Sequence, residues 1–178
     1  MQKEDYFVAL SECHLMNEAT IAEISYFPGV QSWWGSVDGV LRAWAGRSLT
    51  DEWPRPVASE LIKHMDAAGV DVAFALREPA MNVSGYTTCL STNGFIMKEI
   101  EPYPDRLYLE CNVGPILRRG VENAIWEMEY LVKERNARLC KVYAPEDDGP
   151  HNDRRMWPFY EKACELDIAL TVHTGTAY

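Results

Sequence analysis

The stretch MDAAGVDVAFAL, residues 65–76, places the end of a helix directly before a buried strand. An apolar stripe at helical spacing ends at Met65 and Ala68, and Gly69 is a typical helix stop. Residues 70–76 form an apolar run that is too short for an isolated helix, so this run predicts a strand. The stretch therefore predicts one helix–strand step of an alternating α/β fold.

The same alternation continues on both sides of this stretch. Short apolar runs predict further strands, and apolar positions at helical spacing predict helices between them. After the first strand, the predicted strands begin about 30 to 37 residues apart, the length of a βα unit. An alternating order with buried strands predicts a parallel sheet and an α/β fold. The other predicted strands are residues 7–10, 107–113, 138–143 and 168–173, and the other predicted helices are 90–100, 121–132 and 156–163.

Composition narrows the class of protein. The 178 residues are 47% hydrophobic and 25% charged, which is typical of a folded protein. The net charge of −10 argues against nucleic acid as a partner, and no apolar run reaches the roughly 18–20 residues of a membrane span. The five cysteines are scattered without a CxxC motif, which predicts reduced thiols. We expect a cytoplasmic enzyme, or part of one.

The region 25–56 interrupts the alternation. It is long and irregular, and it holds four of the six tryptophans. Two interpretations fit this region equally well: a loop packed on the protein surface, or a segment that covers an active site.

Glu12 and His14 lie two residues apart at the end of the first predicted strand. Side chains two apart in a strand point to the same side. A carboxylate and an imidazole on one side form half of a divalent-metal site, although solvated side chains at a strand end give the same pattern.

His173 and Lys141 lie in two later predicted strands. His173 ends the fifth strand, and parallel α/β enzymes place catalytic and ligand-binding groups at that end. Lys141 lies within an apolar strand, where a lysine needs a partner. It is a candidate to bind a substrate carboxylate or, if carbamylated, to bridge two metals; a lysine that extends to solvent is the alternative. Further candidate substrate contacts follow other strands: His151, Arg77 and Asn112.

Several segments together resemble the amidohydrolase superfamily. The sequence resembles its amidohydrolase-2 branch, which includes aminocarboxymuconate-semialdehyde and γ-resorcylate decarboxylases. The resemblance implies a (β/α)8 barrel, a TIM-type fold, with a metal at the carboxyl ends of the strands. It covers most of the chain apart from region 25–56 and rests on residues 8–14, 65–71, Asn93, 103–107, 139–143, 157–161 and 173–175.

The resemblance also implies a ligand set. Glu12 and His14 match the metal motif of the first strand, and His173 matches the metal histidine of the fifth. The implied cofactor is one divalent ion, Zn²⁺ or Mn²⁺, with Fe²⁺ as an alternative. Lys141 falls on the strand where members with two metals carry a bridging carbamylated lysine. The family's histidine after the sixth strand and aspartate after the eighth have no counterpart here.

A full barrel of this type has about 250 residues, whereas this chain supplies five predicted strands. We therefore expect residues 1–178 to be the N-terminal portion of a single barrel, with region 25–56 as an insertion. The rest of the barrel would come from a longer chain or from a partner chain, in a homo- or hetero-oligomer.

The function implied is metal-dependent, non-oxidative decarboxylation of a small aromatic or enolic carboxylic acid. In this reading Lys141 and His173 are the catalytic residues, and the partner is a small anionic substrate. Three alternatives stay open: hydrolysis of a C–N or lactone bond, oxygenation at a redox-active metal, and a non-catalytic barrel subunit.

Overall fold

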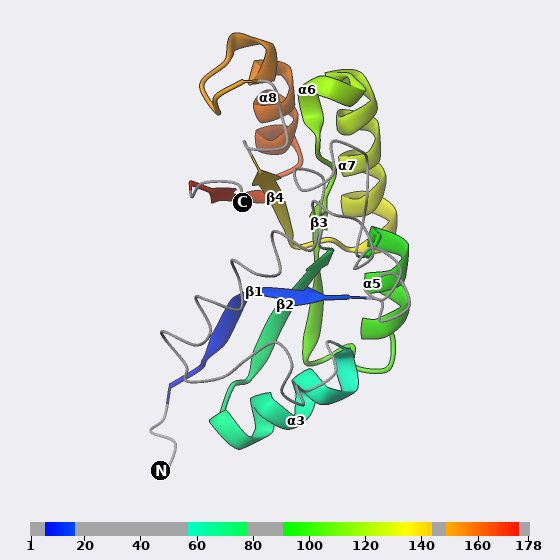
Figure 1. Ribbon diagram of the computed structural model, residues 1–178, viewed down its shortest axis with the longest axis vertical. Coiled ribbons are helices and arrows are strands. Elements are labelled where there is room, and N and C mark those ends of the chain that lie inside the picture. Colours follow the sequence, from blue (N-terminus) through cyan, green and yellow to red (C-terminus); the bar gives the residue numbers. More distant parts are fainter. Residues whose placement is uncertain (1–5, 17–56, 78–90, 144–148, 175–178) are drawn as a thin grey trace, which may run out of the picture.

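The computed structural model describes residues 6–16, 57–77, 91–143 and 149–174. Five strands form one parallel sheet in sequential order (Figure 1). A sequential parallel order requires a crossover behind each strand, as in a barrel. The strands are β1 (Ala9–Leu15), β2 (Val72–Arg77), β3 (Leu107–Asn112), β4 (Leu139–Tyr143) and β5 (Ala169–His173).

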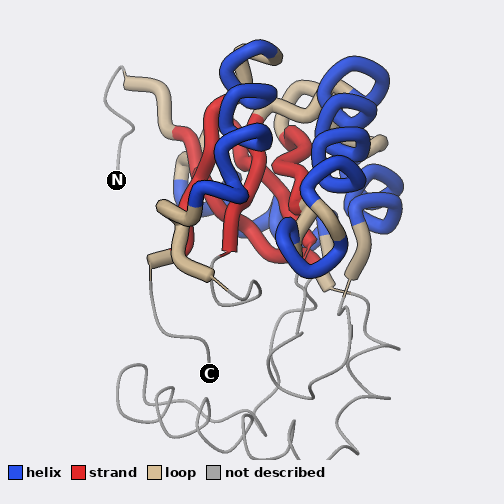
Figure 2. Tube along the Cα trace, turned by 90° about the horizontal axis from the view of Figure 1, so that it is seen from above, coloured by secondary structure: helices blue, strands red, loops and turns tan. Residues whose placement is uncertain are grey.

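Helices alternate with these strands along the chain. Figure 2 shows the strands gathered in one group with the longer helices standing beside them. Five parallel strands that alternate with helices form half of a barrel, so the predicted α/β half-barrel is confirmed. Within the described residues, no helix has the length and apolar character needed to cross a membrane. The helical elements are α3 (Ala58–Ala68), α5 (Asn93–Ile100), α6 (Ile116–Arg119), α7 (Val121–Arg135), the 3₁₀ turn η2 (Arg154–Met156) and α8 (Trp157–Glu165).

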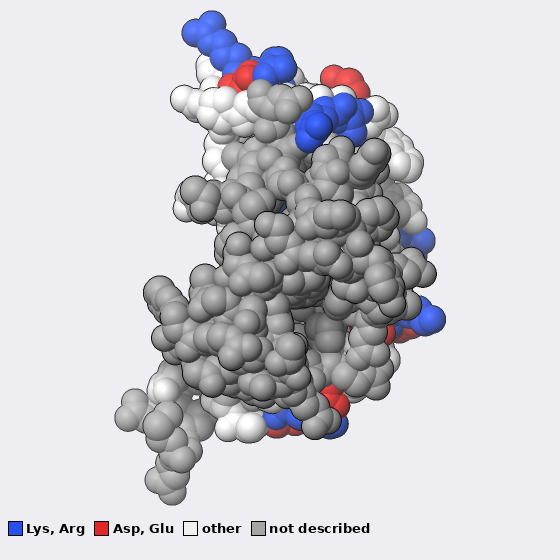
Figure 3. Space-filling view, viewed as in Figure 1, with Lys and Arg blue, Asp and Glu red and all other residues white. Residues whose placement is uncertain are grey.

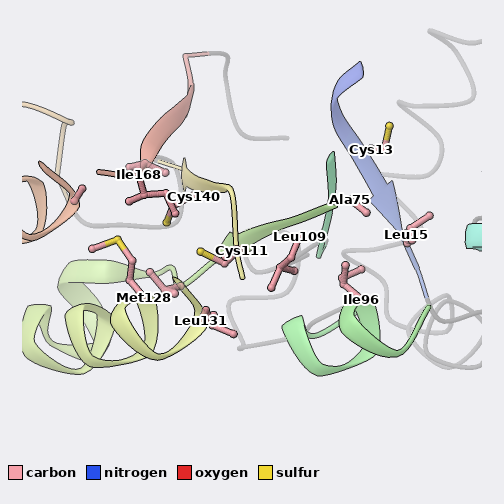
Figure 4. Packing of buried hydrophobic residues seen from close by; sticks show 14 of the residues in the cluster. Cys13, Leu15, Ala75, Ile96, Leu109, Cys111, Met128, Leu131, Cys140 and Ile168 are labelled. Carbon is pink, nitrogen blue, oxygen red and sulfur yellow. The ribbon is translucent and has the colours of Figure 1, made fainter. Parts of the chain in front are cut away.

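The core lies between the outer face of the sheet and the helices. In β1 to β4, alternate residues point toward the helices and are buried there, and in β5 Leu170 is partly buried against the same core (Figure 4). Helices α5 and α7 contribute the facing apolar side chains, among them Ile96 from α5 and Met128 and Leu131 from α7. The core residues labelled in Figure 4 are Cys13, Leu15, Ala75, Leu109, Cys111 and Cys140 from the strands, Ile96 from α5, Met128 and Leu131 from α7, and Ile168 just before β5.

The intervening strand residues point to the opposite, inner face. On this face the apolar pattern gives way to ionisable and polar side chains in four of the five strands. A charged side chain is costly to bury without a partner, so this face is a candidate site rather than a second apolar core. The polar side chains of the inner face are Glu12, His14, Glu110, Asn112, Lys141, Thr171 and His173.

The first strand differs from its prediction. Residues 7–10 are predicted to form it, whereas β1 spans Ala9–Leu15. The pairing with β2 shifts between Leu10 and Cys13, where one extra residue forms a bulge. The bulge turns Cys13 and Leu15 toward the helices and leaves Glu12 on the inner face. The apolar pattern stops at the polar residues next to the bulge, and so it ended the predicted strand too early.

The other predicted strands and helices overlap the observed ones. The helix predicted over 90–100 begins at Asn93, because the Thr92 side chain accepts a hydrogen bond from the backbone N–H of Phe95 and caps the first turn. The predicted tryptophan-rich insertion, 25–56, lies outside the described residues.

Two glycines allow a matched test of this local structure. Gly69 ends α3 with a φ of +71°, and an added Cβ would meet nothing within 4 Å. Gly69→Ala is therefore expected to lower the free energy of unfolding by roughly 1 kcal/mol, through backbone strain alone. Gly94 lies inside α5, where an added Cβ makes an ordinary contact of 3.7 Å with Thr92 Oγ1. Gly94→Ala is expected to raise that free energy by about 0.4–1 kcal/mol in the same urea titration. Equal effects of the two substitutions would contradict the left-handed end of α3.

Candidate active site

An ion pair joins the first and fourth strands across the inner face. Lys141 Nζ donates a hydrogen bond to Glu12 Oε1, although 129 residues separate them along the chain. Two strands lie between β1 and β4 in the sheet, so these side chains meet only because the sheet curves around the inner face. The Lys141 side chain is 4% exposed and that of Glu12 is 39% exposed. The lysine is thus a buried cation at the wall of a more open space.

His14 lies beside the same carboxylate. Its Nε2 is 3.7 Å from Glu12 Oε1. Burial raises the pKa of Glu12, but the hydrogen bond and charge of Lys141, followed by the charges of His14 and His173, outweigh burial and hold this pKa below its usual value. The Glu12 carboxylate is therefore ionised at neutral pH, and both predicted metal histidines lie within its electrostatic reach.

His173 closes this side of the inner face. Its ring lies against Tyr143, with ring centroids 4.2 Å apart, and the same two residues are partners in the pairing of β4 with β5. His151, from the loop after β4, donates through Nε2 to the backbone carbonyl of His173 at 3.0 Å. The Tyr160 hydroxyl donates to the carbonyl of His151 at 2.6 Å. The loop is thus fixed to the end of β5, and the predicted substrate contact His151 lies beside His173.

The three predicted metal ligands share one face but are not gathered around a point. In the segments that the structure describes, no three His, Cys, Asp or Glu side chains are grouped closely enough to hold a metal ion. Glu12 instead bonds to Lys141, whose ammonium group supplies the positive charge next to that carboxylate. The three residues expected as metal ligands thus lie on one face of the sheet, and Lys141 contacts one of them, Glu12.

Glu110 belongs to the same face and was not predicted. The side chain is fully buried in β3, and its Oε1 accepts a hydrogen bond from the Thr171 hydroxyl on β5. Burial raises the pKa of Glu110, and the Thr171 hydrogen bond and the Lys141 charge offset this only in part. The sequence did contain a signal for this site residue: Glu110 is a carboxylate in the middle of the apolar run 107–113, where an ionisable residue is unusual.

Arg77 and Asn112, both predicted as substrate contacts, hold the turn that follows β3. Arg77 is 6% exposed and donates to the carbonyl oxygens of Asn112 and Gly114, each at 2.6 Å. Asn112 Oδ1 accepts from Arg77 at 3.2 Å and from the backbone N–H of Gly114 at 2.9 Å. These bonds bring both side chains together, and they direct the Arg77 guanidinium toward backbone oxygens of the protein itself.

The same turn is tied to two helices through residues that were not predicted as site residues. Asn93, at the start of α5, donates to the Asn112 carbonyl and to Glu127 Oε1, each at 3.0 Å. Glu127 Oε2 in turn pairs with Arg119 at 2.5 Å. Each of these side chains would be costly to bury alone, whereas together they satisfy one another. The network supports the edge of the site at β3.

Basic side chains flank the same end of the molecule. Figure 3 shows Lys and Arg of the described residues gathered where α6 and α8 lie. The sequence of these elements places Arg118 and Arg119 in α6, after β3, and Arg154 and Arg155 in η2, after β4. Elements that follow the carboxyl ends of parallel strands border the site of an α/β fold. Arg119 pairs with Glu127 and Arg155 pairs with Asp153, so acidic partners balance part of this positive charge.

No protein-family model matches the sequence, and no curated protein matches it. Solved structures do match. One is 5-carboxyvanillate decarboxylase from Novosphingobium aromaticivorans with bound manganese, at a TM-score of 0.63 and 18% identity, over 97% of this chain and 52% of that chain. A second is 2,6-dihydroxybenzoate decarboxylase with bound 2,6-dihydroxybenzoate, at 0.58 and 17% identity, over 96% and 51%. A third is 4-oxalomesaconate hydratase from Rhodopseudomonas palustris, at 0.57 and 15% identity, over 94% and 52%.

The chain thus spans about half the length of each of these structures. The structural matches agree with the barrel fold that the resemblance in the sequence implies. At these identities the match concerns the fold. The chain therefore has the fold of one half of a TIM-type barrel, as in these decarboxylase and hydratase structures.

Proposed function

We propose that the chain carries the first part of a metal-dependent decarboxylase that acts on a small aromatic or enolic carboxylic acid. The observation that carries this proposal is the inner face itself: Glu12, His14 and His173 lie with a buried lysine near the carboxyl ends of parallel strands. The two matched decarboxylases support the reaction class, and the manganese bound in one of them supports a divalent ion.

The three residues fit such an ion in chemistry, and Glu12 and His14 also fit it in their mutual spacing. A carboxylate oxygen and an imidazole nitrogen are common ligands of Zn²⁺ and Mn²⁺. Ligand atoms held at about 2.0–2.2 Å from one ion lie roughly 3–4 Å from each other, and His14 Nε2 lies 3.7 Å from Glu12 Oε1. In this proposal Glu12, His14 and His173 hold the ion. When bound, the ion would polarise the substrate carboxylate and a neighbouring hydroxyl.

The remaining side chains would bind the substrate as an anion. Lys141 is the buried cation nearest to Glu12, and it would hold a carboxylate or phenolate oxygen. His151 is fixed beside His173 and would border the substrate. In the reaction the bond to the carboxyl carbon breaks, CO₂ leaves, and the electron pair that stays on the substrate carbon takes up a proton. A protein acid would supply this proton. Cations near the ring hydroxyl oxygen would favour the step, because negative charge moves from the carboxylate into the ring as CO₂ leaves.

We also propose that the chain is one portion of a single barrel, completed by a longer chain or by a partner chain. In the described segments, β1 pairs only with β2 and β5 pairs only with β4. Each of these strands therefore has one edge with backbone groups that another strand could pair with. The matched structures, which are about twice as long, support this proposal.

The direct test is turnover by the metal-loaded protein as it exists in its full assembly. We expect Mn²⁺ or Zn²⁺ to support release of CO₂ from 2,6-dihydroxybenzoate or another 2-hydroxybenzoate. The matched control substrate is 3,5-dihydroxybenzoate, which has no hydroxyl next to its carboxylate and should release no CO₂. Activity on lactones or amides alone would replace this proposal with a hydrolase, and metal-independent CO₂ release would remove the ion from it.

A further inference from the structure

The hydrogen bond between the Glu110 and Thr171 side chains links two strands, β3 and β5, that are not neighbours in the sheet. Glu110 lies on β3 and Thr171 on β5, and β4 separates these two strands in the sheet. Thr171 is the pairing partner of Lys141 in the register of β4 with β5. All three side chains point to the inner face. A carboxyl group that reaches from β3 to Thr171 therefore passes beside the Lys141 side chain.

The second oxygen of the Glu110 carboxyl group could accept a further hydrogen bond. Glu110 Oε2 is buried and has no hydrogen-bond partner within the part of the chain that the structure describes. Leaving a buried carboxyl oxygen without a donor is costly, so such an oxygen calls for an explanation. The nearby donor is the Lys141 ammonium group, which bonds instead to Glu12 on the other side of the inner face.

We infer that Lys141 has two alternative carboxylate partners, Glu12 when the site is empty and Glu110 when a divalent cation occupies it. This inference rests on the proposed metal site. In the empty site the ammonium group supplies the positive charge that Glu12 requires. A cation that binds Glu12 repels the ammonium group, and the vacant oxygen of Glu110 accepts it at the adjacent position. Glu110 is thus a positioning residue, which acts on the cation only through Lys141.

The test measures binding of Mn²⁺ alone to the metal-free, full-length protein by isothermal titration calorimetry. Lys141→Met removes the competing ammonium group and keeps the apolar part of the side chain, so we expect the Kd for Mn²⁺ to fall by about tenfold. Glu110→Gln keeps the shape and the Thr171 contact but removes the second anionic partner, so we expect the Kd to rise by about tenfold. Combined with Lys141→Met, Glu110→Gln should change the Kd less than about twofold.

The double substitution distinguishes an effect of Glu110 that acts through Lys141 from a direct effect of its negative charge on the cation. Glu129→Gln on α7, which removes a carboxylate far from the inner face, is the matched control and should leave the Kd unchanged. An equal rise in Kd from Glu110→Gln with and without Lys141 would show that Glu110 acts directly and would overturn the inference. A rise in Kd on Lys141→Met would overturn it too. If no variant and no wild-type protein binds Mn²⁺ while all remain folded, the metal site itself is wrong, and both proposals are overturned.

Discussion

Replacing His173 with alanine is expected to raise the Kd for Mn²⁺ by at least about 100-fold, because the substitution removes one of three proposed ligands. The side chain lies at the end of β5, close enough to Glu12 to contribute to the lowered pKa of that carboxyl group. Its contact with Tyr143 is also lost, but a single ring contact contributes only about 0.5–1.5 kcal/mol to the free energy of unfolding. The variant should therefore stay folded while it loses the metal.

The measurement is the metal content of the purified protein, together with Mn²⁺ titration of the metal-free form. His64→Ala is the matched control, because His64 is exposed on α3. The control should keep the metal content of the wild type, and the circular dichroism spectra of both variants should match it. Unchanged metal content in His173→Ala would mean that the proposed ligand set is wrong, whatever the activity of the protein.

The sequence predicted the fold because its signals are local. Helical spacing in 121–132 and short apolar runs such as 138–143 depend only on nearby residues, and these elements overlap α7 and β4. Period-2 spacing likewise predicted that Glu12 and His14 share a side, and in the structure they lie 3.7 Å apart. The extent of β1 was wrong because the bulge changes the period within the strand, and a fixed period cannot represent that change.

The partners of the site residues could not be predicted in the same way. The partner of Lys141 lies 129 residues away and that of Glu110 lies 61 residues away, so both pairs depend on the curvature and register of the sheet. A charged residue at a strand end looks the same in sequence whether it binds a substrate or the protein's own backbone. Arg77 illustrates this, since its acceptors lie 35 and 37 residues further along the chain.

Replacing Arg77 with methionine is expected to lower the free energy of unfolding by about 3–5 kcal/mol. The guanidinium group is 6% exposed and donates to two backbone carbonyl oxygens and to Asn112 Oδ1. Methionine fills much of the volume but donates nothing, so these buried acceptors lose their donors. A free energy of unfolding of 5–15 kcal/mol is usual for a domain, so the loss should be plain in a urea titration.

The matched control is Arg138→Met, which removes an exposed arginine next to β4 and should change the free energy of unfolding by less than about 0.5 kcal/mol. Comparison of the two variants decides which role Arg77 has. A binding residue is usually replaced with little loss of stability and a large loss of ligand affinity, whereas a residue that holds a turn shows the reverse. Wild-type stability of Arg77→Met together with weakened binding of 2,6-dihydroxybenzoate would restore the substrate contact expected from the sequence. A large loss of stability would instead show that Arg77 maintains the turn after β3, and Lys141 would then remain as the buried cation proposed to bind an anionic substrate.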